Sequence, residues 1–252
     1  MAGSQAVIGI RQLFRLDEFR EVVALQREVW RFPDIEVLPV RFLVVAAEVG
    51  GQVLGAFDGD RAIGFCLAVP GLRADGLPFL HSHMLGVIPE YRDRGVGRRL
   101  KLRQRQDALA RGISLVEWTF DPLELKNAYL NLGRLGAIVR RYSENHYGPA
   151  GSPLHGGLPT DRCHAEWWLD SPRVRTVLAG QGAGAARCER VSLPADIGRI
   201  RAEDGARARE IQRAAAARLQ SAFARGLAVT GFERSQTEGT YLLEPYSPEQ
   251  RP

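Results

Sequence analysis

Residues 78–100, PFLHSHMLGVIPEYRDRGVGRRL, constrain the fold of this chain more than any other segment. The run that ends at Val87 predicts a strand, and the glycines after it predict a turn that opens a helix. The backbone N–H groups of such a turn and the positive end of the helix dipole point at one spot, a geometry that binds pyrophosphate. The pattern Arg92-x-x-Gly95-x-Gly97 therefore predicts a phosphate-binding loop.

The same predicted strand carries two histidines, His81 and His83. Side chains two residues apart on a strand share a face, so both imidazoles are expected on one side. An imidazole titrates near pH ~6.5, which suits proton transfer beside a phosphate-binding loop. The segment favours a cofactor-dependent proton-transfer enzyme, and the alternative is that either histidine is a hydrogen-bonded residue of the core.

The composition of the 252 residues is that of a globular protein with one large domain or one and a half. The N-terminus lacks the pattern of a signal peptide, and no apolar run approaches the ~20 residues that span a membrane. The three cysteines, Cys66, Cys163 and Cys188, are too few and too scattered for a disulfide framework or a metal site. We expect a cytoplasmic protein without a metal or a membrane partner.

The net charge is +5, and arginine carries almost all of the positive charge. Lys101 and Lys126 are the only lysines among 34 basic residues. A basic balance is compatible with nucleic-acid binding. However, the arginines are spread along the chain, as in proteins from high-GC genomes, and the densest run, 92–111, is explained by an anionic cofactor. We therefore expect no nucleic-acid partner.

The remaining patterns predict alternating strands and helices, with Asp17 and Ser171 as helix caps. Strands are expected at 6–13, on both sides of Asp58-Gly59-Asp60, and at 78–87, 113–120, 137–148, 163–170 and 187–193. Helices are expected at 17–30, 40–48, 95–112, 123–136, 171–180 and 203–225, before a final hairpin. The segment 179–186 reads as a linker, which gives a main domain over 1–178 and a C-terminal helix-plus-hairpin extension over 187–252.

This element order resembles the GNAT superfamily of acyl-CoA-dependent N-acyltransferases over residues 6–170. The most specific residues of the resemblance are Leu85, Gly86, Val87, Arg92, Asp93, Arg94, Gly95, Val96 and Gly97. The resemblance implies an α/β (α+β) fold, with a mixed, mostly antiparallel sheet flanked by helices, splayed central strands and a small C-terminal α/β extension. It also implies that coenzyme A lies with its pyrophosphate on the loop, and that backbone N–H groups near Gly86 and Val87 polarise the thioester carbonyl.

The resemblance gives the histidines a role. Arylalkylamine acetyltransferases of this superfamily carry a His-x-His pair at the positions of His81 and His83, which implies a proton relay for the incoming ammonium group. Glu117, on the strand across the expected gap, is the other candidate base, and its alternative is an ordinary carboxylate paired with an arginine. Asn127 resembles the family asparagine that holds the cofactor.

Leu132 falls where many GNAT members have the tyrosine that protonates the leaving thiolate. Tyr142 and Tyr147 are the candidate substitutes, although each reads equally as a buried tyrosine with a bonded hydroxyl. The thiolate of coenzyme A is also a fair leaving group without an acid. Of the tryptophans, Trp118 and the pair at 167–168 are expected in the core, and the alternative is that they line an apolar pocket.

The segment from Arg140 to 174 resembles a smaller GNAT branch that shares the HSHMLGV and WTFDPL segments, some of whose members are thought to succinylate amino acids. Arg140, Arg141 and Arg162 flank the glycine-rich loop 148–161, which is expected over the acceptor, and Tyr147 lies at its start. Arginine binds carboxylates through two parallel hydrogen bonds. Alternation lets only one of Arg140 and Arg141 face this site, and the alternative for all three is a surface role.

We therefore expect an N-acyltransferase that moves an acetyl or succinyl-type group from acyl-CoA to a small amine, with an amino acid as one candidate. Two alternatives stay open: a non-catalytic acyl-CoA-binding regulatory module and a protein N-acetyltransferase. The histidine pair argues against the first, and the glycine-rich loop and the extra C-terminal segment argue against the second. A homodimer is compatible with the sequence.

Overall fold

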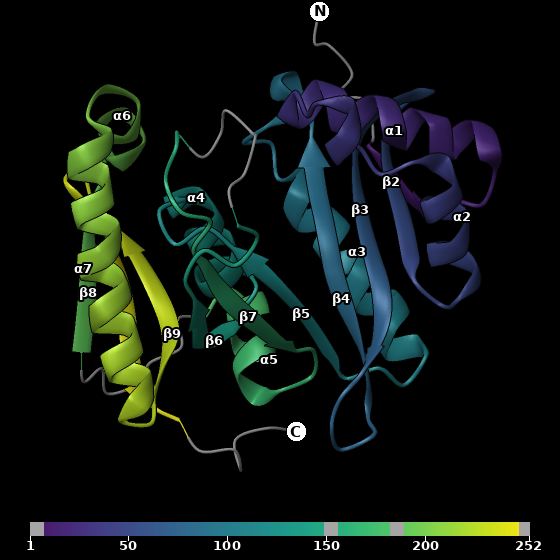
Figure 1. The fold of residues 1–252 in the computed structure, drawn as a ribbon. Coiled ribbons are helices and arrows are strands. Elements are labelled where there is room, and N and C mark those ends of the chain that lie inside the picture. The colour runs from purple at the N-terminus through teal and green to yellow at the C-terminus, as the bar shows by residue number, and fades with distance from the viewer. Residues whose placement is uncertain (1–7, 149–155, 182–188, 247–252) are drawn as a thin grey trace, which may run out of the picture. The chain divides into compact units, whose positions relative to one another are not determined.

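The computed structural model describes residues 8–148, 156–181 and 189–246 (Figure 1). The chain divides into two units, residues 1–116 and 117–252, and strand β5 (Leu115–Phe120) begins in the first and ends in the second. Helices flank strands that pair antiparallel in both units. The α/β fold with a mostly antiparallel sheet, expected from the sequence, is confirmed.

Over the described part of the first unit, four strands precede β5 in the order β1-β2-β3-β4, each antiparallel to the next. Helices α1 and α2 contact each other and the strands, and α3 packs against β2, β3 and β4 (Figure 1). The bounds are β1 (Gly9–Gln12), α1 (Leu16–Trp30), α2 (Val40–Glu48), β2 (Gln52–Asp58), β3 (Arg61–Leu72), β4 (Pro78–Val87) and α3 (Val96–Ala110), with short 3-10 turns at Asp34–Glu36 and Pro89–Tyr91.

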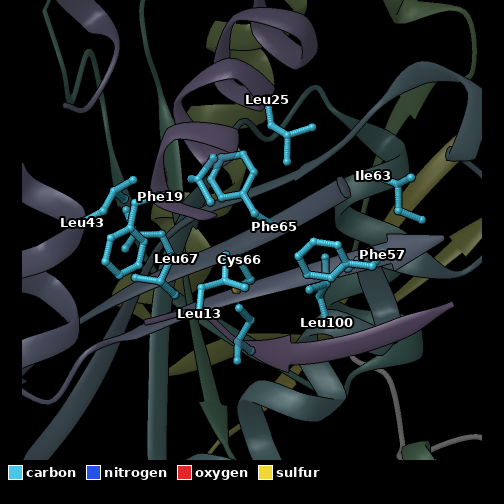
Figure 2. Close-up of a cluster of buried hydrophobic side chains, with 14 of the residues drawn as sticks. Leu13, Phe19, Leu25, Leu43, Phe57, Ile63, Phe65, Cys66, Leu67 and Leu100 are labelled. Carbon is cyan, nitrogen blue, oxygen red and sulfur yellow. The ribbon is translucent and has the colours of Figure 1, made fainter. Parts of the chain in front are cut away.

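The core of this unit forms around β3, whose residues 63–68 are all buried. A continuous buried run is typical of a strand that is covered on both faces. Figure 2 shows Phe65 and Leu67 of β3 among side chains from α1, α2 and α3, including Phe19, Leu43 and Leu100. This packing holds β3 in position. Strand β3 pairs with β4 and thereby positions the strand that carries the histidine pair.

The start of α1 differs from the sequence expectation, because Asp17 is not its cap. The helix begins at Leu16 with Arg15 as its N-cap residue. The Glu18 carboxylate accepts hydrogen bonds from the backbone N–H groups of Phe14 and Arg15, both at 3.0 Å. Asp17 instead pairs with the Arg15 side chain. Ser171 does cap α5 as predicted, since its hydroxyl accepts from the Val174 N–H at 3.3 Å.

Over the described residues of the second unit, five strands follow β5 and lie in the order β7-β6-β9-β10-β8. Strand β9 pairs with β6 through Val139 and Val229, so residues 189–246 extend the same sheet as β6 and β7. Helix α7 packs on β6, β8 and β9. The bounds are α4 (Leu125–Ala128), β6 (Ile138–Ser143), β7 (Arg162–Trp168), α5 (Pro172–Leu178), β8 (Glu189–Pro194), α6 (Ile197–Glu203), α7 (Gly205–Ala224), β9 (Leu227–Arg234) and β10 (Glu238–Pro245).

One helix of this unit differs from its expected form. The segment expected as one helix over 123–136 is α4 followed by a π-helical stretch, Tyr129–Arg134. The helix expected over 203–225 is confirmed as α7, whose first turn is capped by the Asp204 carboxylate through the Arg207 N–H, while α6 before it was not predicted. Most of the expected linker and half of the loop 148–161 lie outside the described residues, and the domain limits stay a prediction.

Candidate active site

The loop between β4 and α3 has the geometry that the glycine pattern predicts. Gly95 is the N-cap residue of α3, and its φ of 78° lies in the left-handed region that favours glycine. Asp93 also has a positive φ, 59°. Among the described residues, no side chain caps the first turn of α3. The N–H groups at the start of this 15-residue helix are therefore available to an anionic ligand.

Gly97 is not required by the packing of the protein itself. A Cβ atom there would meet only the Leu85 side chain, at 3.8 Å, and its φ is not positive. A glycine that neither the backbone conformation nor the packing demands is explained by close approach of a ligand to the backbone. Gly97 therefore supports a pyrophosphate site on this loop, and residues 95–97 fit the group that the resemblance implies.

The arginine side chains of the loop are held by the protein. Arg92 donates from Nε to the Val87 carbonyl at 3.1 Å and from Nη2 to the Val29 carbonyl at 3.2 Å. The Arg94 guanidinium lies 5.1 Å from the centre of the Tyr91 ring. Arg92 thus ties the loop to β4 and α1. Val96, by contrast, is buried in the core.

The end of β4 is fixed by close packing. Gly86 is buried, and a Cβ atom there would lie 3.0 Å from the Trp30 ring and 3.1 Å from the Phe65 ring. Leu85 and Val87, on either side, pair with Cys66 and Gly64 of β3. The backbone that the resemblance assigns to the thioester carbonyl is therefore held rigidly by its own unit.

The two histidine rings lie close together, with centroids 6.1 Å apart. A β-bulge interrupts the regular pairing of β4 with β3 at His83. Leu67 pairs with Met84 and Ala68 with Ser82, so His83 is the extra residue of β4. The His83 side chain is accessible to solvent, yet the surrounding protein lowers its pKa by disfavouring the charged form. A lowered pKa keeps this imidazole neutral and able to accept a proton at neutral pH.

Ser82, between the two histidines, enters a buried polar network that sequence reasoning missed. Lys101 of α3 donates from Nζ to Ser82 Oγ at 2.8 Å and to Gln104 Oε1 at 2.9 Å. The Gln104 side chain donates to Cys66 Sγ at 3.4 Å. Lys101 is only 2% exposed, and burial lowers its pKa to about 8. The one available signal was a lysine in this helix in a chain with only two lysines among 34 basic residues.

The two tyrosines of the second unit differ in their surroundings. Tyr142 donates its hydroxyl to Asp161 Oδ2 at 2.7 Å. Burial and the Asp161 charge raise the pKa of Tyr142 far above its usual value, which makes it a poor proton donor. Tyr147 is exposed, and its hydroxyl shares a hydrogen bond with Thr119 Oγ1 at 2.8 Å. The geometry favours a structural role for Tyr142 and leaves Tyr147 as the better candidate.

The three arginines expected near the acceptor are used differently. Arg140 donates two hydrogen bonds to Glu166, one of them from Nη2 to Oε2 at 2.6 Å, and its guanidinium lies 5.3 Å from the centre of the Tyr246 ring. The charge of Arg140 is therefore already paired within the protein. Arg141 is exposed on the same strand. Arg162 lies over the Tyr147 ring at 5.2 Å, and its Nε is buried without a hydrogen-bond partner among the described residues. Of these three arginines, Arg162 is therefore the one with a buried donor that has no acceptor among the described residues.

The other predicted site residues belong to the second unit. Glu117 is half-buried on β5, Asn127 is exposed on α4, and Leu132 is buried at 1% exposure in the π-helical stretch. Leu132 cannot supply a proton, so no acid comes from that position. The loop and the histidine pair belong to the first unit, and the expected splay of the strands that carry Val87 and Glu117 stays a prediction.

Comparison with known proteins decides the family. Residues 12–130 match the acetyltransferase (GNAT) family. An acetyltransferase of Sodalis glossinidius is 31% identical over 114 residues, which cover 40% of this chain and 68% of the relative. The chain belongs to the GNAT family. Membership of the GNAT family supports acyl-CoA-dependent N-acetyltransferase activity.

Solved structures show the same fold. A GNAT-family acetyltransferase from Desulfovibrio desulfuricans has a TM-score of 0.52 and 15% identity, covering 65% of this chain and 99% of that one. Arabidopsis thaliana Naa50, in complex with a bisubstrate analogue, has a TM-score of 0.51 and 14% identity, covering 63% and 97%. Over the described residues of this GNAT protein, no helix is long and apolar enough to cross a membrane, and no group of three His, Cys, Asp or Glu residues is arranged to hold a metal ion.

Proposed function

We propose that this GNAT protein acylates the amine of a small molecule that carries a carboxylate. An acetyl or succinyl-type group would come from acyl-CoA, and an amino acid is the leading class of acceptor. The observation that carries this proposal is Arg162, a half-buried guanidinium with an unpartnered Nε beside the exposed Tyr147. A buried charged donor without an acceptor is costly, and a substrate carboxylate supplies the acceptor.

The loop residues would bind the cofactor. Backbone N–H groups at Gly95–Gly97 face the pyrophosphate, and Arg92 holds the loop in place through the Val87 carbonyl. Bound acyl-CoA would supply an activated thioester carbonyl. The rigid backbone at Gly86 and Val87 would orient donors toward that carbonyl as charge develops on its oxygen.

The histidine pair would remove the proton of the incoming ammonium. His83, at the bulge, is accessible and has a lowered pKa, so it is neutral and ready to accept the proton. His81, with its ring 6.1 Å away, would pass the proton onward, directly or through water.

The two cysteines that the structure describes, Cys66 and Cys163, are free thiols, which supports a reduced, cytoplasmic compartment.

A thiol-release assay tests this proposal. Acetyl-CoA and succinyl-CoA are each offered with matched amines that differ only in the carboxylate, such as an amino acid and its amide. We expect Arg162→Ala to raise KM for the carboxylated amine about ten- to a hundredfold, the loss of one charged hydrogen bond of about 1.5–3 kcal/mol. The KM of the amide should not change.

Arg175→Ala is the matched control, because Arg175 is an exposed arginine of the same unit that was not expected near the acceptor. It should leave both KM values unchanged. An uncharged amine as the best substrate, with no effect of Arg162→Ala, would contradict the acceptor proposal. Release of thiol with peptides only would favour a protein N-acetyltransferase instead.

A further inference from the structure

The second unit contains a cavity that the proposed reaction does not use. Its volume is about 310 Å³, and it lies between the start of β6, the end of β7, the first turn of α5, the middle of β9 and the end of β10. Ile138 pairs with Glu166 at this end of the β6–β7 pair, whereas Ser143 pairs with Arg162 at the other end. Five residues of strand separate the two ends, roughly 17 Å. The cavity is therefore distinct from the surroundings of Arg162.

Arg173 lines this cavity with an unused donor. Its side chain is 19% exposed, and its Nε is buried with no hydrogen-bond partner among the described residues. Its nearest anion is Glu244, with Nη1 and Oε1 3.8 Å apart, which is too long for a hydrogen bond. A buried guanidinium in this state requires an acceptor from a ligand or from water.

Two carboxylates also line the cavity, and only one is satisfied by the protein. Glu166 accepts from Arg140 through both oxygens and from Trp168 Nε1 at 3.2 Å. Glu244 is 13% exposed, and its side chain has only the 3.8 Å contact with Arg173 over the described residues. Arg173 and Glu244 thus lie next to each other in the cavity wall, and each can form further hydrogen bonds with a ligand.

The other walls of the cavity are apolar or aromatic. Ile138, Trp168 and Tyr246 contribute apolar surface, and Thr230 adds a hydroxyl. Trp168 and Tyr246 are each held by polar contacts of their own, to Glu166 and Arg140 respectively. The volume is at the lower end of small-molecule sites, which span about 300–1,000 Å³. A ligand of this cavity is therefore small, with an apolar body and two opposite charges.

We propose that this cavity is a second ligand site, which binds a free α-amino acid with an apolar side chain. The carboxylate would accept from Arg173, the ammonium would donate to Glu244, and the side chain would lie against Trp168, Ile138 and Tyr246. A ligand with a carboxylate but no ammonium would place a second anion beside Glu244. A ligand with an ammonium but no carboxylate would leave Arg173 without a hydrogen-bond acceptor. The zwitterion satisfies both groups, and the proposal does not depend on the acceptor of the reaction.

Isothermal titration calorimetry of the full chain tests this site. The probes are L-leucine and L-phenylalanine, with leucinamide and 4-methylpentanoate as analogues that lack one charge. The titrations use Arg162→Ala as background, without acyl-CoA, so that the proposed acceptor site does not contribute. We expect at least one amino acid to bind, and both analogues to bind at least tenfold more weakly.

Arg173→Gln and Glu244→Gln should each weaken amino-acid binding at least tenfold. Arg175→Gln, a change of an exposed arginine on the same helix, should have no effect. Circular dichroism and Tm establish that each variant is folded, and Glu244→Gln keeps the shape of the side chain. The proposal would be overturned if amino-acid binding survived both cavity variants, or if the wild type bound the amino acid and Arg162→Ala did not. It would also be overturned if neither amino acid bound at millimolar concentration.

Discussion

Lys101 donates a hydrogen bond from Nζ to Ser82 Oγ at 2.8 Å, and Ser82 stands between His81 and His83 on β4. The lysine is buried, so a polar contact inside the core joins α3 to the strand that carries the histidines. A buried ammonium is costly, and the cost is relieved when the lysine loses its proton.

Stability should therefore depend on pH through Lys101. Its folded-state pKa, about 8, lies below the usual value of 10.5, so the unfolded chain binds more protons between these two pH values. Stability rises with pH in that window, by at most ~3 kcal/mol. We expect Lys101→Met to remove this rise, measured by denaturant unfolding from pH 7 to 10.5.

The comparison of wild type with Lys101→Met isolates the lysine below about pH 9. Above that pH, Cys66 contributes the opposite pH dependence, because burial raises the pKa of its thiol. The charge of Lys101 lowers this pKa, so the substitution also changes the contribution of Cys66 there. A constant difference in the free energy of unfolding across the whole range would show that Lys101 does not titrate in this window.

The two glycines near the loop should respond in opposite ways. Gly97→Leu should abolish coenzyme A binding with little change in Tm, because the fold does not need glycine there. Gly86→Ala should destabilise the protein by about 1–3 kcal/mol, because the new methyl group meets the Trp30 and Phe65 rings. Calorimetric titration with coenzyme A and thermal unfolding measure the two effects. Unchanged affinity in Gly97→Leu would place the pyrophosphate elsewhere.

The Tyr142 hydroxyl should matter for stability rather than for turnover. Its pKa is raised by burial and by Asp161, so it holds its proton throughout the working pH range. Tyr142→Phe should keep kcat within about threefold and lower stability by roughly 1–3 kcal/mol, because the Asp161 carboxylate loses a hydrogen-bond donor. A loss of a hundredfold in kcat with an unchanged Tm would restore Tyr142 as a general acid.

Local signals account for the parts of this structure that the sequence predicts well. The glycine turn between β4 and α3, the hairpin around Asp58-Gly59-Asp60 and the Ser171 cap each depend on a few adjacent residues. The burial of Trp118, Trp167 and Trp168 follows from their size and apolar character, as expected.

The features that could not be predicted depend on contacts between residues that are distant in the sequence. Arg140 is occupied by Glu166, 26 residues away, and alternation along β6 does not reveal this pair. The bulge at His83 depends on how β4 pairs with β3, and the Lys101 network joins three separate elements. The two-residue spacing predicted that the two histidines share a face of the strand, and their ring centroids lie 6.1 Å apart. Their chemical role stays a prediction.

The pH–rate profile of the double variant His81→Gln/His83→Gln tests the central claim most directly. The base must be neutral to accept the proton of the amine, so the wild-type rate should fall as pH decreases through a pKa below the usual 6.5 of His83. We expect kcat of the double variant to fall about a hundred- to ten-thousandfold and this acidic limb to disappear, with unchanged coenzyme A affinity. A double variant that keeps both its rate and its pH profile would contradict the account and make Glu117 the leading base.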